Sequence, residues 1–204
     1  MSPDQEGNKI FVYADADISL QNMHPEALNP TSLYLILNGL EFQRDLRQHL
    51  LEQYDIDTLR LDNGYVIKNE DKQVTLLPPV IEVMRESVVF NNDRGDKVYD
   101  QAHVINTHII TDGLHRVALA RALGIKPKVI IMRGIPYEHP FYAYPNNWED
   151  ISIFDGEPET KEQKKLYRRE DCYALYRDFG VLDVGVPRHT GKGKRVMALH
   201  EWKP

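Results

Sequence analysis

The chain contains a single cysteine, Cys172, among its 204 residues. One thiol excludes an internal disulfide framework and is typical of a reducing compartment, so we expect a cytoplasmic protein. Because Tyr and Leu residues surround Cys172 in the sequence, we expect it to be buried as a small apolar residue without a catalytic role.

Long apolar runs and an excess of basic residues are also missing. No segment approaches the ~20 apolar residues of a membrane-spanning helix, and the acidic, polar residues 1–6 do not resemble a signal peptide. The net charge is −6, which argues against a dedicated nucleic-acid-binding protein. We therefore expect no membrane contact, and we consider a nucleic-acid partner an unfavoured alternative.

What is present is typical of a globular protein. Hydrophobic residues make up 42% of the chain and charged residues 27%, and there are no repeats or low-complexity segments. The length predicts one domain, or one domain with an appendage. We place the domain at residues 1–155, with an N-terminal extension and a core near residues 76–135. A C-terminal helix and a basic tail follow at residues 156–204.

The stretch from Ile109 to Ile125 is the most informative part of the sequence. An apolar run ends at residues 112–113, and a pattern of Ala, Leu and Arg, which all favour helices, continues through residue 123. Gly124 stands where a glycine commonly ends a helix. Another apolar run follows at residues 128–132. The pattern predicts a strand, a tight turn, a helix and a second strand.

The turn carries residue types that bind anions. Thr111 or Asp112 can cap the helix, and Gly113 lets a ligand approach the backbone closely. The first N–H groups of a helix are unpaired and lie at its positive end, where His115 and Arg116 are also expected. These features predict a phosphate site. The alternative is an ordinary turn with a surface His and Arg.

The remaining patterns predict further elements and two loops of possible functional use. The aromatic loop at residues 134–148 is either a wall over a substrate or a loop packed on the core by its rings, and we take Trp148 as a substrate-binding residue. The basic residues 188–195 lack the spacing of a phosphate-binding loop. The expected elements are a strand at 9–13, a helix opening at 30 and broken at 38–39, a helix at 41–54, a hairpin turning at 62–64, strands at 80–83 and 87–90 with a hairpin tip at 91–96, and a helix at 160–179.

The Asp-Gly-Leu-His-Arg sequence at residues 112–116 resembles the nucleotide-binding motif of the ParB/sulfiredoxin superfamily. In that superfamily such a turn opens a helix and holds nucleotide phosphates. The resemblance covers residues 76–135 and implies an α+β fold, with a mixed sheet and flanking helices, to which this chain adds a C-terminal helical appendage. It implies phosphate contacts from Thr111 through Arg116.

Two departures narrow this resemblance. Sulfiredoxins need a cysteine immediately before the His-Arg pair, and this chain has Leu114 there, so reduction of sulfinic acids is excluded. Chromosome-partition ParB proteins continue into helix-turn-helix segments, for which this chain has no convincing room. The closest resemblance is to the small-molecule branch, which includes kinases that phosphorylate free serine.

The resemblance therefore implies an ATP- or ADP-dependent kinase that uses Mg²⁺ and a small hydroxyl-containing substrate such as a free amino acid. These kinases keep a glutamate base before the nucleotide motif, so Glu26 is the first choice for the base and Glu82 the second. Asp112 is expected to orient His115 or to contact the metal ion.

The acids near residues 15–26 lack a calcium-loop pattern, so we expect no protein metal site there. The alternative is a nucleotide-gated DNA-binding or nuclease module, and the oligomeric state stays open.

Overall fold

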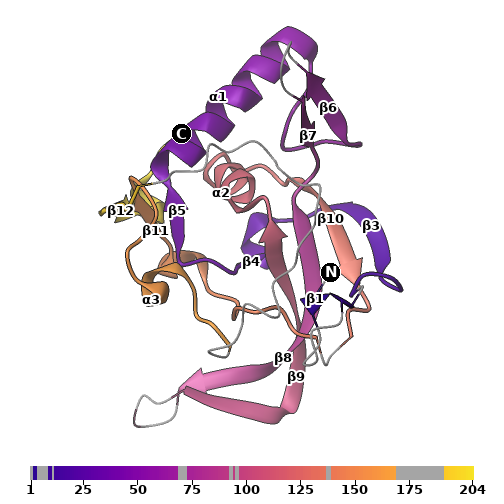
Figure 1. The fold of residues 1–204 in the computed structure, drawn as a ribbon, viewed down its shortest axis with the longest axis vertical. Coiled ribbons are helices and arrows are strands. Elements are labelled where there is room, and N and C mark those ends of the chain that lie inside the picture. The colour runs from indigo at the N-terminus through magenta and orange to yellow at the C-terminus, as the bar shows by residue number, and fades with distance from the viewer. Residues whose placement is uncertain are drawn as a thin grey trace.

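The fold is mixed α+β, as predicted. The computed structural model describes residues 2–3, 9–10, 12–68, 73–91, 94, 97–136, 139–168 and 191–204. Figure 1 shows the elements in space. The helices are η1 (Pro25–Ala27), α1 (Leu37–Tyr54), α2 (Leu114–Ala122), η2 (Trp148–Asp150), α3 (Lys161–Lys164) and η4 (Leu199–Glu201), where η marks a 3₁₀ helix. The strands are β1 (Ser2–Pro3), β2 (Lys9–Ile10), β3 (Asp17–Asn22), β4 (Asn29–Pro30), β5 (Tyr34–Ile36), β6 (Tyr65–Lys68), β7 (Gln73–Leu76), β8 (Val80–Asn91), β9 (Lys97–Asp112), β10 (Lys128–Arg133), β11 (Ser152–Phe154) and β12 (Arg195–Ala198).

The main sheet has the strand order β3-β10-β8-β9-β4. The β10–β8 and β9–β4 pairs are parallel, and the β3–β10 and β8–β9 pairs are antiparallel. The predicted strand, turn, helix and strand around residues 109–132 are confirmed as the end of β9, then α2, then β10. Because α2 returns the chain to β10, which lies beside β8, the turn at residues 112–113 lies at one end of the central strands.

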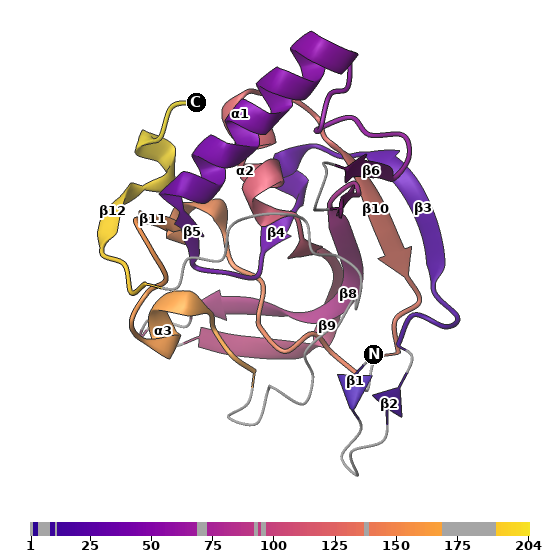
Figure 2. The same cartoon turned by 45° about the horizontal axis from the view of Figure 1, so that its top comes forward.

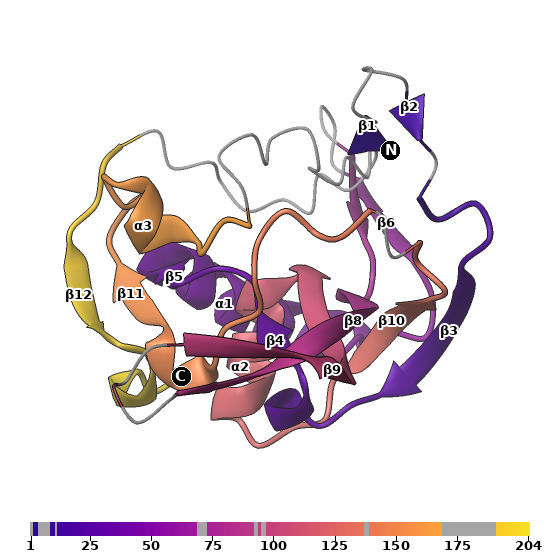
Figure 3. The ribbon, with the colours of Figure 1, turned by 90° about the horizontal axis from the view of Figure 1, so that it is seen from below.

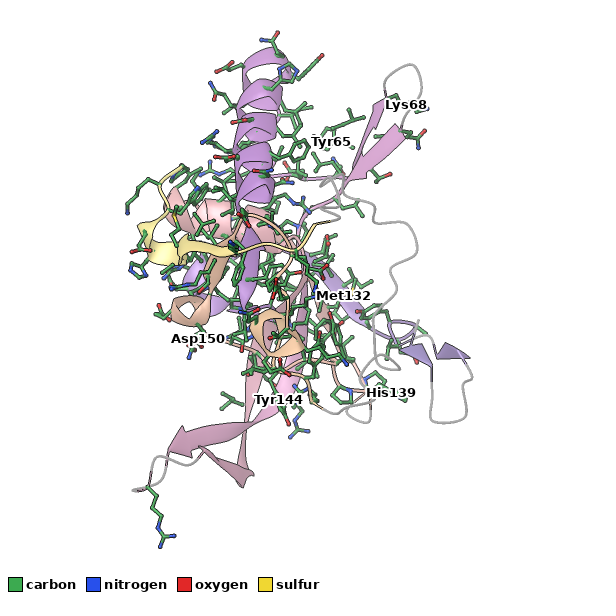
Figure 4. All side chains as sticks on the ribbon, turned by 60° about the vertical axis from the view of Figure 1, so that its left-hand side comes forward. Tyr65, Lys68, Met132, His139, Tyr144 and Asp150 are labelled. Carbon is green, nitrogen blue, oxygen red and sulfur yellow. The ribbon has the colours of Figure 1, made fainter. Side chains whose placement is uncertain are left out.

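Strands β8 and β9 form a long hairpin whose far part extends from the body as an arm (Figures 1 and 4). The pairing runs from Val80 opposite Asp112 to Asn91 opposite Lys97, so the predicted hairpin tip between residues 91 and 97 is confirmed. The register shifts between Ser87 and Val88. The near half of the hairpin belongs to the main sheet, because there β8 pairs with β10 and β9 pairs with β4, and it ends at the predicted phosphate turn.

Helix α2 packs its apolar side into the main core. The residues from Val117 to Ala120 are all at most 1% exposed, and they join Ile81, Val129 and Ile131 of the sheet. Helix α1 contacts α2. Burial of this apolar surface holds the start of α2 in a fixed place relative to the sheet.

Helix α1 begins at Leu37, so the prediction that residues 38–39 break a helix is wrong. A Cβ atom at Gly39 would lie 2.7 Å from Nε2 of His115. The glycine therefore provides room for the histidine ring in the first turn of α1. The helix expected to open at residue 30 is also wrong, because Tyr34–Ile36 is strand β5, whose partner is the distant β11.

Two other local predictions need correction. The hairpin pairs β6 with β7, with Tyr65 opposite Leu76, and does not use residues 59–61. The reason is that Leu59 and Leu61 are buried in two different apolar clusters. Tyr65 also packs with the apolar side of the second half of α1, and Figure 4 labels it on this hairpin. The strand predicted at residues 9–13 ends earlier, because Val12 lies in a turn.

The C-terminal segment adds a second, smaller sheet with the order β12-β11-β5 (Figures 2 and 3). Leu199 and Trp202 belong to the main core. The helix predicted at residues 160–179 ends at Lys164, because Lys165 is already extended. Residues 169–179, including Cys172, lie outside the described residues, as do residues 188–190 of the basic tail. Within the part of the chain that the structure describes, no helix is long and apolar enough to cross a membrane.

Candidate functional site

A pocket of about 230 Å³ lies at the start of α2. Its wall contains every residue of the predicted motif from 111 to 116. The loop after β4 contributes Thr31 and Ser32, α1 contributes Gln43, and the segment after α3 contributes Lys165. The fold therefore brings residues from three other parts of the sequence to the predicted phosphate turn.

The first turn of α2 lacks a side-chain cap. Its N-cap residue is Gly113, with φ of 81°, and no side chain accepts a hydrogen bond there. The expected cap by Thr111 or Asp112 is wrong, because Gly113 is the N-cap residue and has no side chain to accept a hydrogen bond. The hydroxyl of Thr111 instead donates to the carbonyl oxygen of Val80 at 3.1 Å. A Cβ atom at position 113 would lie 2.8 Å from Cβ of Pro79. The first N–H groups of a helix have no intrahelical partner, and the residues that carry them here line the pocket.

Arg116 is a buried cation in the pocket wall, with 1% of its surface exposed. Its Nη1 donates to the carbonyl oxygen of Leu77. Its Nη2 lies 3.7 Å from Oδ2 of Asp112, and neither of these atoms has a hydrogen-bond partner. Burial lowers the pKa of Arg116 to about 10, and the charge of Asp112 opposes this shift. The guanidinium is therefore still charged at neutral pH.

Opposing effects act on the pKa of the Asp112 carboxyl. Burial raises the pKa of its carboxyl, while the charge of Arg116 and the backbone N–H of Gly113 lower it, and the net shift is upward. Its proton affinity is thus greater than that of an ordinary aspartate. A carboxyl in this condition accepts a proton more readily than a surface acid does.

Unpartnered polar atoms gather at this pocket. Among the described residues, five buried side-chain atoms have no hydrogen-bond partner, and three of them belong to Gln43, Asp112 and Arg116 in the pocket wall. Each unsatisfied buried group costs about 1–3 kcal/mol. Their concentration in one place indicates a site prepared for a polar ligand.

His115 lies between the starts of α1 and α2. Its Nε2 accepts a hydrogen bond from the backbone N–H of Ile36 at 3.1 Å. An accepting Nε2 carries no proton, so the ring in this arrangement is neutral. The ring also fills the space above Gly39. His115 therefore links the start of α1 to the start of α2, and it is also part of the pocket wall.

Lys165 is a pocket residue that sequence analysis missed. Burial lowers the pKa of its amine to about 8, and its Nζ lies 5.1 Å from the ring centre of Tyr142. It stands in a run of Lys and Arg residues at 164–169, and such a run is usually a solvated face, so the pattern does not single out Lys165. Thr31, Ser32 and Gln43 were also missed, because their only link to the motif is tertiary contact.

A model of the ParB CE domain family matches residues 5–152. The match covers more than half of the chain. The chain belongs to the ParB CE domain family. This confirms the predicted membership of a ParB-like superfamily. No curated protein and no solved structure shows significant similarity to the chain. Within the pocket, the ParB CE domain match includes residues 31–116 and leaves out Lys165.

Three of the predicted site residues of this ParB CE domain do not line the pocket. Glu26 lies in η1, where its carboxylate accepts a hydrogen bond from Nε of Arg121 at 2.7 Å. Glu82 has no exposed surface and accepts a hydrogen bond from the hydroxyl of Tyr13. Trp148 is 4% exposed and donates from Nε1 to the carbonyl oxygen of Pro25 at 3.0 Å. The structure does not bring these three together with the turn.

Acidic and histidine ligands do not gather into a metal site in the described parts of the chain. No group of three or more His, Cys, Asp or Glu side chains is placed to hold an ion there. Among the described residues that line the pocket, Asp112 is the one with a carboxylate. The described part of the basic tail lies along β11, where the backbone N–H of Lys194 donates to Oδ1 of Asp155 at 2.6 Å.

Proposed function

We propose that this ParB CE domain protein binds the phosphates of a nucleoside di- or triphosphate in the pocket and transfers a phosphoryl group to a small hydroxyl-containing molecule. The observation that carries the proposal is the unpartnered Nη2 of buried Arg116 beside the uncapped start of α2. A guanidinium and the N-terminus of a helix are the two protein groups best suited to phosphate oxygens.

The size and charge of the pocket support a phosphate chain as its content. Its volume of about 230 Å³ is below the roughly 300–1,000 Å³ of pockets that enclose a whole drug-sized ligand. A phosphate chain fits within it, and the nucleoside would lie outside. Arg116, Lys165 and the positive end of α2 supply the charge that such a chain needs.

Asp112 is the proton acceptor in this proposal. Glu26 and Glu82 have other partners outside the pocket, whereas Oδ2 of Asp112 is buried and unpartnered within it. The acceptor hydroxyl oxygen forms a bond to the terminal phosphorus, the bond to the leaving phosphate oxygen breaks, and the hydroxyl proton passes to Asp112. The raised pKa of this carboxyl favours that proton transfer.

Mg²⁺ belongs to the proposal as an ion that arrives with the phosphates. Such ions keep several waters and use few protein ligands, so the absence of an acidic cluster from the described residues is compatible with it. The hydroxyl groups of Thr31 and Ser32 in the pocket wall would hold the ion, which would neutralise phosphate charge during transfer.

The test is a thermal-shift screen of ATP, ADP, CTP and GTP with and without Mg²⁺, followed by calorimetry. A nucleotide that binds only the native state raises the apparent stability. Phosphoryl transfer is then followed by phosphorus NMR with serine, threonine and nucleosides as acceptors. The rival function would give no transfer to any acceptor and DNA binding that weakens steeply with salt.

A further inference from the structure

The pocket is completed by a segment outside the matched family region. The family match ends at residue 152, whereas Lys165 in the pocket wall follows α3. In the ribbon, α3 and α2 lie apart (Figures 2 and 3). The positive groups Arg116 and Lys165 therefore reach the pocket from different parts of the structure.

Backbone hydrogen bonds hold this segment in place. The carbonyl oxygen of Lys164 accepts from the backbone N–H of Leu33 at 2.9 Å and from the hydroxyl of Ser32 at 3.2 Å. Further along, the backbone N–H of Arg168 donates to the carbonyl oxygen of Tyr142 at 3.1 Å. Lys165 lies between these two anchors, so the backbone is fixed on both sides of it.

Adjacent lysines of the segment have different surroundings. The chain leaves the helix at Lys165, which has φ of −159° and ψ of 154°. The amine of Lys164 donates to Oε1 of Glu157 at 2.6 Å and is not in the pocket wall. The amine of Lys165 is held over the ring of Tyr142, where burial lowers its pKa to about 8. An anion in the pocket would offset that burial.

We propose that Lys165 contacts the phosphate chain and makes the pocket prefer ligands with two or three linked phosphates over a single phosphate. The inference rests on the proposed function, because it names a contact within the same pocket. In this proposal, Arg116 and the start of α2 bind one phosphate group. A longer chain extends to the second positive group, and the pocket volume allows for it.

The test compares the full-length protein with Lys165→Met and with Lys164→Met as the matched control. Isothermal titration calorimetry measures binding of inorganic phosphate and inorganic triphosphate. We expect Lys165→Met to weaken triphosphate binding roughly ten-fold or more while phosphate binding changes little, since a charged hydrogen bond is lost. Lys164→Met should behave as the wild type. Equal triphosphate affinity in Lys165→Met and the wild type would overturn the inference, whereas a wild type that binds neither anion nor nucleotide would overturn the proposed function as well.

A second measurement needs no variant that might fold poorly. Binding of ADP near pH 8.5 is titrated in two buffers with different ionisation heats. The terminal phosphate of ADP is already ionised there, because its second pKa is near 6. The other ionisable groups of the wall contribute little at this pH. Arg116, whose pKa burial lowers to about 10, is still mostly charged, Asp112 is of a type that titrates well below pH 8.5, and the ring of His115 accepts a hydrogen bond at Nε2 and is neutral. Lys165 is partly deprotonated and gains a proton when the anion binds. Net proton uptake is expected, and its absence would contradict the contact.

Discussion

Arg116 is a charged side chain with almost no exposed surface. Its Nη1 donates to the carbonyl oxygen of Leu77, whereas its Nη2 has no hydrogen-bond partner among the described residues. Asp112 is near enough for charge attraction but not for a hydrogen bond. A buried, incompletely paired ion is destabilising. An anionic ligand that accepted hydrogen bonds from the guanidinium of Arg116 and from the uncapped start of α2 would explain why a charged side chain is buried here.

Replacing Arg116 should therefore separate binding from folding. We expect Arg116→Ala to lose roughly 1.5–3 kcal/mol of nucleotide binding, the range for hydrogen bonds to charged groups. Arg116→Lys keeps the charge but not the two-pronged contact, so it should fold and still bind more weakly. Arg121→Ala is the control, because that arginine lies on the same helix and pairs with Glu26 outside the pocket. Calorimetry showing unchanged affinity in both Arg116 variants would remove the residue from the site.

The start of α2 is the element that positions the motif. Gly113 has a positive φ of 81°, and any side chain there meets Pro79. Gly124, just after the same helix, also has a positive φ of 65°, but nothing lies within 4 Å of a Cβ atom there. The two glycines share the backbone conformation and differ only in their surroundings.

This pair allows a controlled test. Gly113→Ala should lose more stability than Gly124→Ala, because a left-handed residue with a Cβ costs about 1–2 kcal/mol at either position and only position 113 adds a clash. Nucleotide binding should weaken in Gly113→Ala alone. Thermal melts and calorimetry on the two variants measure both effects. Equal losses of stability would show that Pro79 yields to the new methyl group.

A second element-scale feature anchors α1. Arg47 donates to both carboxylate oxygens of Asp57, at 2.8 and 2.9 Å, and Oδ1 also accepts from the backbone N–H of Leu59. Burial alone would raise the pKa of Asp57, but these hydrogen bonds and the charge of Arg47 lower it overall. The ionised form is therefore preferred in the folded protein.

Asp57→Asn should destabilise the protein by about 1–2 kcal/mol at neutral pH, because the charged pair is lost. A lowered folded-state pKa gives stability that is present above the ordinary Asp pKa and is lost as the pH falls through the folded value. The difference between wild type and variant should therefore shrink in acid. Asp45→Asn is the control, since the Arg44–Asp45 pair is largely exposed. Urea denaturation at several pH values measures these differences, and a difference that grows in acid would contradict the pairing.

In the molecule as a whole, segments spread between residues 31 and 165 meet at one pocket. Loop 31–32, α1, the α2 turn and Lys165 come from four parts of the sequence. The carboxylate in this assembly is Asp112, and the exposed pairing of Glu26 with Arg121 lies apart from it. Turnover is the property that distinguishes these two acids.

Asp112→Asn should keep nucleotide binding, or improve it by removing a negative charge, and should lose phosphoryl transfer by about 100-fold or more, the range for a proton-transfer group. Glu26→Gln should retain turnover. Phosphorus NMR with ATP or ADP and a panel of hydroxyl amino acids follows the reaction. Loss of turnover in Glu26→Gln with normal turnover in Asp112→Asn would restore the early glutamate as the base.

The local parts of this protein could be predicted from its amino-acid sequence. The turn at residues 111–116, helix α2, strand β10 and the β8–β9 hairpin follow from periodicity, glycine placement and apolar runs, which act between near neighbours in the chain. The resemblance of the turn to a ParB-like motif was local as well, and the family match confirms it.

Which side chains share the pocket depends on contacts between segments that are distant in the sequence, and these could not be predicted from it. The local pattern at Gly39 predicts a helix break. In the structure Gly39 lies within α1, where the absence of a side chain leaves space for the ring of His115. Lys165 is read as part of a solvated charge run, yet hydrogen bonds from Ser32 and Leu33 to Lys164 set it in the wall. Glu26 is of a residue type that can act as a base, but its carboxylate accepts a hydrogen bond from Arg121 outside the pocket. A sequence pattern shows the periodicity of a single helix or strand. Burial and side-chain pairing between distant segments depend on how the helices and strands pack together. Neither segment alone contains a pattern that predicts this packing.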